Sequence, residues 1–303
     1  MKYESLLHVI GNTPLVRVKF DTPARVYAKL EYLNPAGSLK DRSALFMVEE
    51  AERTGKLRPG GTIIEASSGN QGIATALVGC LKGYKVIITV SEKISKEKQD
   101  TLKAYGAELV VCKASTELDD PEGYYQTAVN IQKKTPNSFM LAQYYNEENA
   151  RSHYYGLGPE IWNQTYGELT HFIGALGSGG TVRGVGTYLK ERNKNIQIVG
   201  VDVANSYRAT GGHPKPYKLE GIGVDYDSPH IRAAKIDEYI NVMDDDAIAM
   251  LRTMARKHGM LVGPSGGAVA AAAYEYTKKL TAKDLVVMTM GDSGRAYLTK
   301  NFF

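Results

Sequence analysis

Lys40 is the residue of this sequence whose type and position are best suited to covalent chemistry. It follows the turn-forming residues 35–38 and begins a segment with helical periodicity. The positive end of a helix disfavours the ammonium form of a lysine, and a neutral lysine amine can form a Schiff base with a carbonyl compound. Since Asp41 and Arg42 follow directly, a solvated lysine with no catalytic role is the alternative interpretation.

A loop rich in glycine could hold a phosphate group. It consists of Gly177, Ser178, Gly179, Gly180 and Thr181, and it joins a predicted strand to a predicted helix. Backbone N–H groups at such a turn converge on an anion at the helix N-terminus. The spacing matches neither a dinucleotide fingerprint nor a Walker A loop, so a small phosphate monoester fits it better than a nucleotide. A tight strand–helix connection without any ligand is the alternative.

A second loop repeats this arrangement and offers hydroxyl and amide groups. Its residues are Ser67, Ser68, Gly69, Asn70 and Gln71, and an α-carboxylate would suit it. Asn70 could also donate a hydrogen bond to a ring oxygen. Farther along the chain, Ser265 opens an alanine-rich helix, where a serine is most often an N-cap but could also face a heteroaromatic nitrogen.

Together, these features indicate pyridoxal phosphate chemistry. A lysine that can form a Schiff base, a phosphate loop, a carboxylate loop and a neutral partner for a ring nitrogen are what this cofactor needs. A neutral Ser265 would leave the pyridine ring largely unprotonated and hence a weaker electron sink. Loss of the α-proton coupled to expulsion of a β-leaving group is then the reaction that we expect.

Short apolar runs alternate with helical periods along the chain and must position these loops. Strands are expected at residues 62–66, 86–90, 108–112, 171–176, 196–203 and 285–290, and helices at residues 40–54, 71–82, 96–105, 181–192, 245–258 and 266–280. The strands are apolar on both alternations, which is typical of parallel sheets covered on both faces. We therefore predict a doubly wound α/β fold, in which ligands bind beyond the carboxyl ends of the strands.

The composition narrows the class of protein. The chain has 303 residues, 43% of them apolar, and a formal net charge of +4. These are ordinary globular values, which exclude a disordered tail or a fibre, and the length favours two domains. Lys and Arg form no basic block, and no run is long and apolar enough for a membrane helix. We therefore expect neither nucleic acid nor a membrane as a partner.

The cysteines and histidines give no metal-ligand pattern. Cys80 and Cys112 lack the spacing of a metal site and stand in apolar segments, which predicts two reduced, buried thiols, no bound metal and a cytoplasmic location. The six histidines do not cluster, and we expect His153 to be a packing residue beside two tyrosines.

Several motifs, in a fixed order, resemble those of one family. They are residues 10–15 (IGNTPL), 34–42 (NPAGSLKDR), 68–70 (SGN), 179–181 (GGT), 220–223 (EGIG) and 263–265 (GPS). On these motifs the chain resembles, over nearly its whole length, the cysteine synthase and cystathionine β-synthase family of fold-type II pyridoxal phosphate enzymes. The resemblance implies two doubly wound α/β domains with mostly parallel sheets and an active site in the cleft between them. A large cofactor-binding domain would comprise residues 1–40 and 146–303, a smaller mobile domain residues 41–145, and the enzyme would be a homodimer.

The resemblance also implies a role for each site residue. Lys40 would form the internal aldimine and move the α-proton, while Asn70 would bond the 3-oxygen of the cofactor and Ser265 its pyridine nitrogen. Residues 177–181 would hold the phosphate. The α-carboxylate of the substrate would be held by Ser67, Ser68, Gly69, Gln71 and Gln143, and a loop with Gly221 and Gly223 would line the substrate side.

Two departures from the family pattern bear on the substrate. Gln71 stands where the asparagine loop of the family usually has a threonine. Asp225 follows the glycine loop, where cysteine synthases tend to have small residues and cystathionine β-synthases have an acid. An added carboxyl at Asp225 could act as an acid or a base, and the alternative is a residue that only caps or salt-bridges the loop. The chain shows neither the N-terminal haem segment nor the C-terminal regulatory module of some relatives, so we expect a catalytic core.

These residues predict β-replacement on a serine-type amino acid through an α-aminoacrylate. The preferred reaction is that of a cysteine synthase, in which O-acetylserine and sulfide give cysteine. One alternative consumes L-cysteine and releases hydrogen sulfide, with water or a thiol as the nucleophile and Asp225 at its centre. A second alternative is plain β-elimination, as in serine and threonine dehydratases. A binding protein that retains the fold without catalysis is the alternative from another class.

Overall fold

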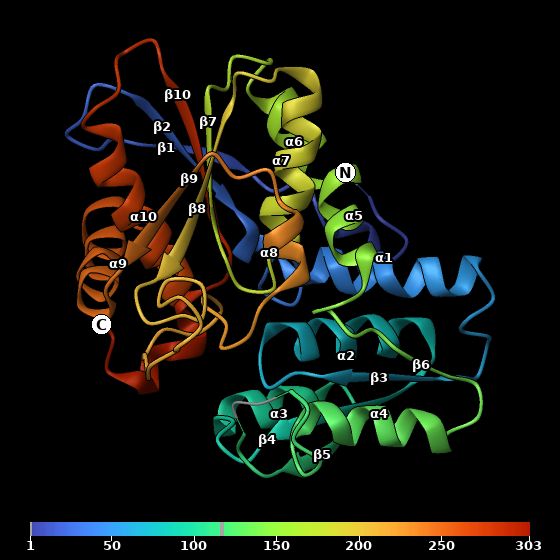
Figure 1. Cartoon of the computed structure of the whole chain (residues 1–303). Helices are drawn as coiled ribbons and strands as arrows, with labels where there is room; N and C mark the ends of the chain where they lie inside the picture. Colours follow the sequence, from blue (N-terminus) through green and yellow to red (C-terminus); the bar gives the residue numbers. More distant parts are fainter. Residues whose placement is uncertain (1, 116–117) are drawn as a thin grey trace. The chain divides into compact units, whose positions relative to one another are not determined.

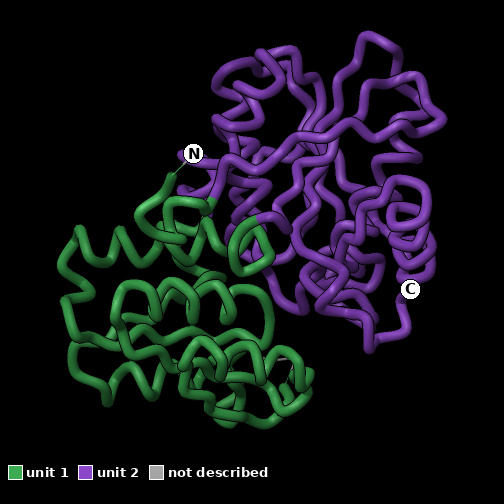
Figure 2. Tube along the Cα trace, turned by 180° about the vertical axis from the view of Figure 1, so that it is seen from behind, with its two compact units in different colours: residues 1–10, 34–149 green, residues 11–33, 150–303 purple. Residues whose placement is uncertain are grey.

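The structure is a computed structural model that describes residues 2–115 and 118–303 (Figure 1). The chain forms two compact units, which are coloured separately in Figure 2. Unit 1 comprises the first ten residues and Asn34–Asn149, and unit 2 comprises Gly11–Leu33 and Ala150–Phe303. These boundaries differ from the expected ones at residues 1–10, 34–40 and 146–149, all of which belong to unit 1. For residues 34–40 the reason is that helix α1 (Lys40–Arg53) packs against α2 (Asn70–Lys82) of the same unit.

Unit 1 contains a four-stranded parallel sheet in the order β5-β4-β3-β6. Its strands are β3 (Thr62–Ala66), β4 (Lys85–Ser91), β5 (Glu108–Cys112) and β6 (Ser138–Met140). Helices α1, α2 and α3 (Lys96–Ala104) contribute to the core on one face, and α4 (Tyr124–Lys134) contributes to the core on the other (Figure 1).

The strand β3 is buried along its whole length. Ile63 packs among side chains of α1 and α2, whereas Ile64 packs on the side of α4. Because side chains alternate along a strand, Glu65 points to the same face as Ile63, and it is only 1% exposed. A carboxyl group thus lies inside an otherwise apolar layer.

Unit 2 contains a six-stranded sheet in the order β1-β2-β10-β7-β8-β9. Its strands are β1 (Leu15–Val18), β2 (Arg25–Leu30), β7 (His171–Ala175), β8 (Gln197–Val203), β9 (Glu238–Val242) and β10 (Leu285–Met290). Strand β1 runs antiparallel to β2, and the other pairs are parallel.

Helices cover both faces of this second sheet (Figure 1). Helices α9 (Asp244–His258) and α10 (Pro264–Thr277) contribute to the core on one face, and α6 (Leu157–Gln164) and α7 (Gly180–Arg192) to the core on the other. The remaining elements of the described chain are α5 (Glu147–Tyr155), α8 (Pro229–Ala233) and the 3-10 segments η1 (Leu6–Val9), η2 (Glu31–Leu33) and η3 (Gly294–Lys300), of which η1 lies in unit 1.

A buried network of charges ties the N-terminal strands of unit 2 to α6. Lys29 on β2 is fully buried, and its Nζ lies 2.8 Å from Glu160 Oε2. The same amine donates to the backbone oxygen of Thr13 at 2.6 Å and to Gln164 Oε1 at 3.0 Å. The motif at residues 10–15 therefore has a structural role, because its Thr13 oxygen accepts a hydrogen bond from the buried Lys29 amine.

The predicted α/β class is confirmed, since both sheets are mostly parallel and carry helices on both faces. Each of the predicted strands and helices is present, with ends that differ from the expected ones by at most three residues. The sequence pattern did not reveal β1, β2, β6, β9, α4, α5, α6 or α8. Strand β6 is only three residues long, and β9 alternates between half-buried and exposed positions at the sheet edge.

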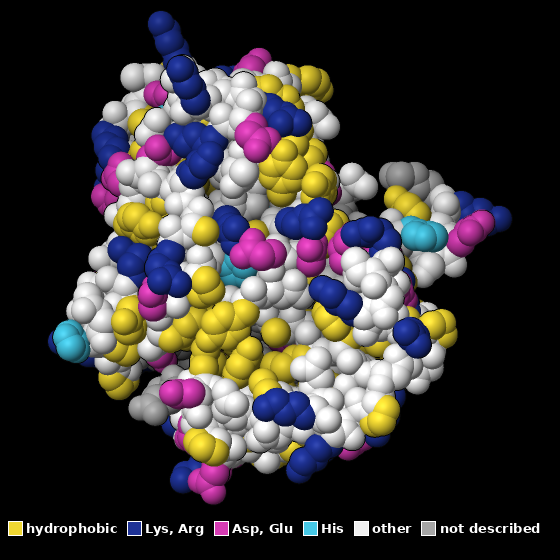
Figure 3. All heavy atoms as spheres, turned by 45° about the vertical axis from the view of Figure 1, so that its right-hand side comes forward, with side chains coloured by type: hydrophobic (Ala, Val, Ile, Leu, Met, Phe, Trp, Pro, Cys, Tyr) yellow, Lys and Arg dark blue, Asp and Glu magenta, His cyan; other side chains and the backbone are white. Residues whose placement is uncertain are grey.

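The surface carries charges of both signs. On the face drawn in Figure 3, Lys and Arg side chains lie among Asp and Glu side chains. Exposed ion pairs such as Lys96–Asp100 and Lys278–Glu275, each 2.7 Å long, contribute little to stability because solvent screens them. None of the helices in the described residues has the length and apolar character needed to cross a bilayer.

Candidate active site

The topology of unit 1 brings its candidate residues to one edge of the sheet. From β3 the strands β4 and β5 follow on one side, whereas β6 lies on the other side of β3. The chain segments that leave β3 and β6 at their carboxyl ends therefore diverge, which is where open α/β sheets bind ligands. Residues 67–69 leave β3, and Gln143 follows β6. The carboxylate loop and Gln143 thus belong to the same topological switch point.

Lys40 is the first residue of α1, and its side chain is directed to this edge. Its Nζ donates a hydrogen bond to Gln143 Oε1 at 3.1 Å, and its backbone N–H donates to Ser38 Oγ at 3.2 Å. Burial lowers the pKa of Lys40 to about 8, although the nearby charge of Glu65 acts in the opposite direction. An amine with this pKa is partly neutral near pH 8 and can act as a nucleophile or a base.

The loop after β3 is a tight turn into α2. The Ser67 hydroxyl accepts a hydrogen bond from the backbone N–H of Gly69 at 3.2 Å, and α2 begins at Asn70. A Cβ at Gly72 would lie 2.7 Å from the backbone oxygen of Ser67, so only glycine fits where the helix passes under the turn. The 13-residue helix α2 starts directly after this turn, and backbone N–H groups at a helix start can bind an anion.

The other predicted residues of this loop are also held in place. Ser68 Oγ accepts a hydrogen bond from the backbone N–H of Ser91 at 2.8 Å. Gln71 is buried, and its Oε1 accepts from Ser43 Oγ on α1 at 2.9 Å. The Nε2 of Gln71 is buried without a hydrogen-bond partner among the described residues. Gln71, which was expected to face the substrate, therefore links the loop to α1 and retains one unused donor.

Glu65 is a functional candidate that sequence reasoning missed. Both of its carboxylate oxygens are buried and have no hydrogen-bond partner of ordinary geometry among the described residues. Burial raises the pKa of Glu65 to about 8, against the opposing effects of the backbone N–H groups of Ala142 and Gln143 and of the Lys40 charge. The signal in the sequence was an acidic residue inside the apolar run of residues 62–66.

The topology of unit 2 gives the glycine loop a corresponding position. Strands β8 and β9 follow β7 on one side, and β10 lies on its other side. Residues 176–179 leave the carboxyl end of β7 at this switch point and lead into α7. Gly179 is the N-cap residue and has a left-handed backbone with φ +90°. Backbone N–H groups at the start of this 13-residue helix are thus available to an anion.

Neighbouring side chains fix the shape of the glycine loop. Ser228 Oγ donates to the backbone oxygen of Ser178 at 2.7 Å, and a Cβ at Gly179 would lie 2.7 Å from Ile231 Cγ1. The Thr181 hydroxyl lies 3.2 Å from His153 Nε2. His153 is fully buried, so the expected packing residue also contacts the loop that was predicted to hold the phosphate.

Ser265 lies next to the glycine loop within unit 2. It is the second residue of α10, whose N-cap is Gly263, so the interpretation of Ser265 as the N-cap is wrong. It is largely buried, and its hydroxyl makes no hydrogen bond within the described part of the chain. A Cβ at Gly221 would lie 3.8 Å from Ser265 Oγ, and a Cβ at Gly177 would lie 3.1 Å from the Gly221 oxygen. Gly177, Gly221 and Ser265 therefore adjoin one another.

Asp225 follows this second glycine segment and is half-buried. Gly223 adopts φ +78° and donates its N–H to the backbone oxygen of Leu176 at 2.7 Å, which fixes the segment beside β7. Burial raises the pKa of Asp225, and a hydrogen bond from the Tyr217 hydroxyl acts in the opposite direction. The Asp225 carboxyl group is thus held by Tyr217, an uncharged partner that donates a hydrogen bond to it.

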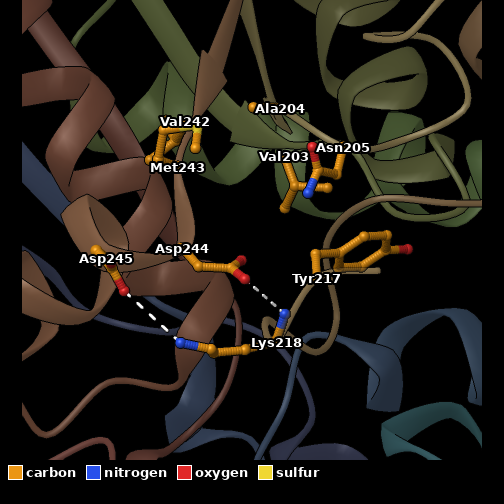
Figure 4. A pocket seen from close by; sticks show the side chains of 9 residues that line it. All are labelled: Val203, Ala204, Asn205, Tyr217, Lys218, Val242, Met243, Asp244 and Asp245. Carbon is orange, nitrogen blue, oxygen red and sulfur yellow. Dashed lines mark hydrogen bonds and ion pairs between the residues drawn. The ribbon is translucent and has the colours of Figure 1, made fainter. Parts of the chain in front are cut away.

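Tyr217 also lines a cavity of about 180 Å³ at the carboxyl ends of β8 and β9. Figure 4 shows the Tyr217 hydroxyl directed away from Lys218 and Asp244. The backbone N–H of Lys218 donates to Asp244 Oδ2 at 2.7 Å, and Lys218 Nζ lies 3.8 Å from Asp245 Oδ1. Lys218, Asp244 and Asp245 are therefore engaged with one another, whereas the Tyr217 hydroxyl is the group of this cavity that bonds Asp225.

A family model described as "Pyridoxal-phosphate dependent enzyme" matches residues 6–292 of the chain. The chain belongs to this family. The match covers the glycine loops of both units and Lys40. The predicted cofactor is therefore confirmed at the level of the family, and the protein is a pyridoxal-phosphate-dependent enzyme.

Three relatives show how specific the similarity is. The chain is 38% identical to an O-acetylserine-dependent cystathionine β-synthase of Bacillus subtilis, over 98% of this chain and 97% of that protein. It is 39% identical to a cysteine synthase of Staphylococcus aureus, over 98% of this chain and 96% of that protein. A crystal structure of a hydrogen sulfide-producing enzyme from Fusobacterium nucleatum matches with a TM-score of 0.92 and 33% identity, over 98% of this chain and 99% of that chain.

The residues of this pyridoxal-phosphate-dependent enzyme fit the cofactor group by group. Lys40 offers an amine of lowered pKa for the aldehyde. The helix start at Gly179 offers N–H groups in a turn that a Cβ would fill. Ser265 is 6% exposed, and its hydroxyl makes no hydrogen bond among the described residues, so it is available to a polar atom of a ligand.

Proposed function

We propose that this enzyme exchanges the β-substituent of a serine-type amino acid in cysteine metabolism. In the preferred reaction, O-acetylserine and hydrogen sulfide give L-cysteine and acetic acid. One observation carries the proposal: the Lys40 amine lies 3.1 Å from Gln143 at the switch point that also bears the loop of residues 67–71. A base and a carboxylate-binding loop at the same edge are what proton removal from an α-amino acid requires. The names of the B. subtilis and S. aureus relatives support this reaction class.

Residues of unit 1 handle the amino acid in this proposal. Ser67, Ser68 and the N–H groups at the start of α2 bind the α-carboxylate, and the unused Nε2 of Gln71 and the amide of Gln143 add donors. Asn70 donates to the 3-oxygen of the cofactor. Lys40 takes the α-proton and later returns it to the same carbon, because its lowered pKa lets the amine hold a proton only part of the time.

Residues of unit 2 orient the cofactor. Gly177, Ser178, Gly180, Thr181 and the N-cap Gly179 bind the phosphate with backbone N–H and hydroxyl groups. When bound, pyridoxal phosphate withdraws electrons from the α-carbon, so that the α-proton and then the β-substituent can leave. Ser265 offers a neutral hydroxyl to the ring nitrogen, which limits this withdrawal and favours departure of the β-substituent. Gly221 and Gly223, both in left-handed conformations, line the substrate side.

Replacement of Lys40 by alanine tests the proposal. Purified Lys40→Ala protein should show less than a thousandth of the wild-type rate of cysteine formation from O-acetylserine and sulfide, while retaining a folded thermal transition. Lys98→Ala is the matched control, because Lys98 is also a buried lysine of unit 1, and it should retain the rate. A Lys40→Ala protein with full turnover, or pyruvate as the main product of the wild type, would overturn the proposal.

A second candidate reaction is favoured by Asp225 and its partner Tyr217. Here the enzyme consumes L-cysteine and releases hydrogen sulfide, with water or a thiol as the incoming nucleophile. Hydrosulfide is a poorer leaving group than acetate and water a poorer nucleophile than sulfide, so an acid or base beside the β-carbon gains importance. Asp225, whose pKa is raised by burial, could supply either function. The Fusobacterium relative that is named for hydrogen sulfide production supports this candidate.

The Asp225→Asn variant distinguishes the two reactions. If Asp225 serves cysteine consumption, the substitution should lower sulfide release from L-cysteine at least tenfold more than it lowers cysteine formation from O-acetylserine. Equal losses in both reactions would limit Asp225 to a structural role in its loop. L-cysteine as sole substrate, with the amino-acid product identified as serine or lanthionine, reports the nucleophile directly.

We further propose a cytoplasmic homodimer that takes only small molecules as substrates. Both cysteines, Cys80 and Cys112, are free thiols, which fits a reducing compartment. Cys112 is buried as expected, whereas Cys80 on α2 is exposed, so the expectation of a buried thiol is wrong there. The dimer rests on the family resemblance, and light scattering at several protein concentrations tests it. A monomer at concentrations at which the enzyme is active would refute the dimer.

A further inference from the structure

Glu65 lies in unit 1 beside the groups to which the proposed function assigns chemistry. It occupies the fourth position of β3, one residue before the strand ends at Ala66. Its carboxyl group is buried on the face that α1 and α2 cover, and Lys40 is the first residue of α1. Glu65 has no role in the proposed reaction, although it lies beside Lys40, which has one.

The backbone turn at Ala142 directs N–H groups towards the Glu65 carboxylate. Ala142 adopts a left-handed conformation with φ +49°, which is uncommon for a residue with a side chain. The N–H of Leu141 donates to the Ile64 oxygen at 3.0 Å, so the turn is fastened to β3 directly beside Glu65. The N–H groups of Ala142 and Gln143 act on the Glu65 carboxylate from this turn, although neither carboxylate oxygen closes a hydrogen bond of ordinary geometry.

The same turn connects Glu65 with Lys40 through Gln143. The backbone N–H of Gln143 faces Glu65, while its side-chain Oε1 accepts the hydrogen bond from Lys40 Nζ at 3.1 Å. Asn149 Nδ2 donates to the backbone oxygen of Gln143 at 2.8 Å and thereby also holds this residue in place. A change in the charge of Glu65 therefore reaches Lys40 both through space and through the residue that orients the amine.

We propose that Glu65 is the positioning residue of Lys40, whose carboxyl group sets the charge state of the amine and hence the pH range in which Lys40 can bond an aldehyde. The inference depends on the proposed function only in that Lys40 is the lysine that binds the cofactor. It does not depend on which amino acid is the substrate.

The sign of the effect follows from burial and Coulomb attraction. Burial lowers the pKa of Lys40 to about 8 and raises the pKa of Glu65 to about 8, and the attraction between the two charges opposes both shifts. Without the carboxylate, only the burial effect on Lys40 remains. Removal of the Glu65 charge should therefore lower the pKa of Lys40 further and make the amine neutral at a lower pH.

Other charged or titratable groups around the pair do not change this sign. Tyr125 on α4 feels the charge of Glu65, but burial is the main reason that its pKa is raised to about 12, so it stays protonated. Asp41 on α1 directs its carboxylate to the N–H of Ala36 at 2.6 Å, and Arg42 next to it is buried. The helix α2 carries no acidic or basic side chain before Lys82 at its far end.

The strands beside β3 add no charge next to Glu65. Ile88 is its partner on β4, and the neighbouring residue Ile64 is paired with Met140 on β6. Lys85, the first residue of β4, is exposed, and its Nζ lies 2.8 Å from Glu108 Oε2, so its charge is paired there. Lys40 is therefore the one basic group that acts on Glu65 among the described residues.

The test measures how fast the cofactor-free, full-length protein captures pyridoxal phosphate at pH 6 to 10, read from the absorbance of the cofactor. Schiff-base formation requires the neutral amine, whose lone pair attacks the aldehyde carbon while water leaves. In Glu65→Gln the midpoint of the rate profile should fall by about one pH unit, the lower end of what a neighbouring opposite charge produces. The two rates should differ most around the wild-type midpoint, where Glu65 is charged in part of the molecules, and should converge at the lower end of the pH range, where Glu65 is itself protonated.

Three further variants separate charge from structure. Glu65→Leu is a second neutral variant that leaves no buried polar group, so it should show the same downward shift if Glu65→Gln does not fold. Glu65→Asp retains the charge and should stay close to the wild-type midpoint. Asp202→Asn removes another buried carboxylate, in unit 2, which is held by Ser206 and Arg208, and it should change the melting temperature without moving the profile.

Two kinds of result would overturn the role proposed for Glu65. A neutral Glu65 variant whose profile coincides with that of the wild type or moves to higher pH overturns the inference, as does an equal shift in Asp202→Asn. Borohydride reduction followed by peptide mass analysis identifies the lysine that has captured the cofactor. If that lysine is not Lys40, the proposed function fails; if it is Lys40 and the profile does not move, only the role of Glu65 fails.

Discussion

Replacing Gly179 by alanine should weaken pyridoxal phosphate binding, because two separate penalties meet at this residue. Gly179 has φ +90°, and its position as N-cap of α7 requires this conformation. A Cβ built there would lie 2.7 Å from Ile231 Cγ1 and 2.8 Å from the Ile231 backbone nitrogen. The side-chain atom could turn away, but the backbone nitrogen belongs to α8 and cannot move without displacing that helix.

The magnitude follows from the two penalties. An L-residue in the left-handed conformation costs about 1–2 kcal/mol, and forcing an extra methyl group into a packed region costs about 1–3 kcal/mol. If the loop relaxes in the cofactor-free protein, these penalties appear when the cofactor binds. Even the lower limit, about 2 kcal/mol, raises Kd about 30-fold.

The assay is a titration of cofactor-free protein with pyridoxal phosphate, followed by absorbance, together with thermal unfolding with and without the cofactor. Gly259→Ala is the matched control. Gly259 also has a positive φ, +66°, at the end of α9, but nothing lies within 4 Å of a Cβ there. This variant should lose about 1 kcal/mol of stability with an unchanged Kd. A folded Gly179→Ala protein whose Kd stays within threefold of the wild type, or an equal change of Kd in Gly259→Ala, would refute the reasoning.

Two further predictions concern the scaffold of unit 2. Lys29→Met removes the amine that lies 2.8 Å from the largely buried Glu160 carboxylate. In urea denaturation this variant should lose about 2–4 kcal/mol of the free energy of unfolding, while the folded protein binds the cofactor with unchanged Kd. A loss below 0.5 kcal/mol would contradict the prediction. Burial lowers the pKa of His171, mainly because the ring is removed from water. The unfolded chain therefore binds the proton more readily, and stability should fall as the pH drops below about 6.5; His171→Gln should have a shallower dependence of stability on pH over that range, and an unchanged slope would speak against the role of this ring.

The sequence predicted those elements whose residues satisfy one simple pattern. Strand β3 occupies the predicted residues 62–66, and β10 the predicted residues 285–290, because both strands are buried on both faces and are therefore apolar throughout. Edge strands do not obey this rule. Strand β9 has only one fully buried position, Val242, and its mixture of polar and apolar residues resembles a loop when it is read alone.

The candidate site was predictable in part for a similar reason. Glycine and serine next to a strand end predict a turn at an open sheet edge, and the structure has such turns after β3 and β7. Contacts between segments distant in sequence follow no local pattern. The hydrogen bond between Lys40 and Gln143 spans 103 residues, and the one that ties Ser228 to Ser178 spans 50. Gln143 was predicted only through the family resemblance, and Ser228 was not predicted at all.

Glu65 shows where the same rule misled. A strand with both faces buried should hold no charge unless the charge is paired or its pKa shifts, so the acid in the run of residues 62–66 was the informative residue of that strand. The apolar neighbours concealed it. An ionisable group within an apolar strand, followed by a loop of hydroxyl and amide residues, is a pattern that could find such groups from sequence.

The two units use the same topological device for different parts of the chemistry. In each sheet, strands continue in one direction from a central strand and a later strand pairs with its other side, so that β3 and β7 have corresponding positions. Unit 1 offers side chains that can change charge at this position, namely Lys40 and Glu65. Unit 2 offers mainly backbone N–H groups in the turn at Gly179, with the uncharged hydroxyl of Ser265. Substitutions at the switch point of unit 1 should therefore act on rates and their pH dependence, whereas those at the switch point of unit 2 should act on the affinity for the cofactor.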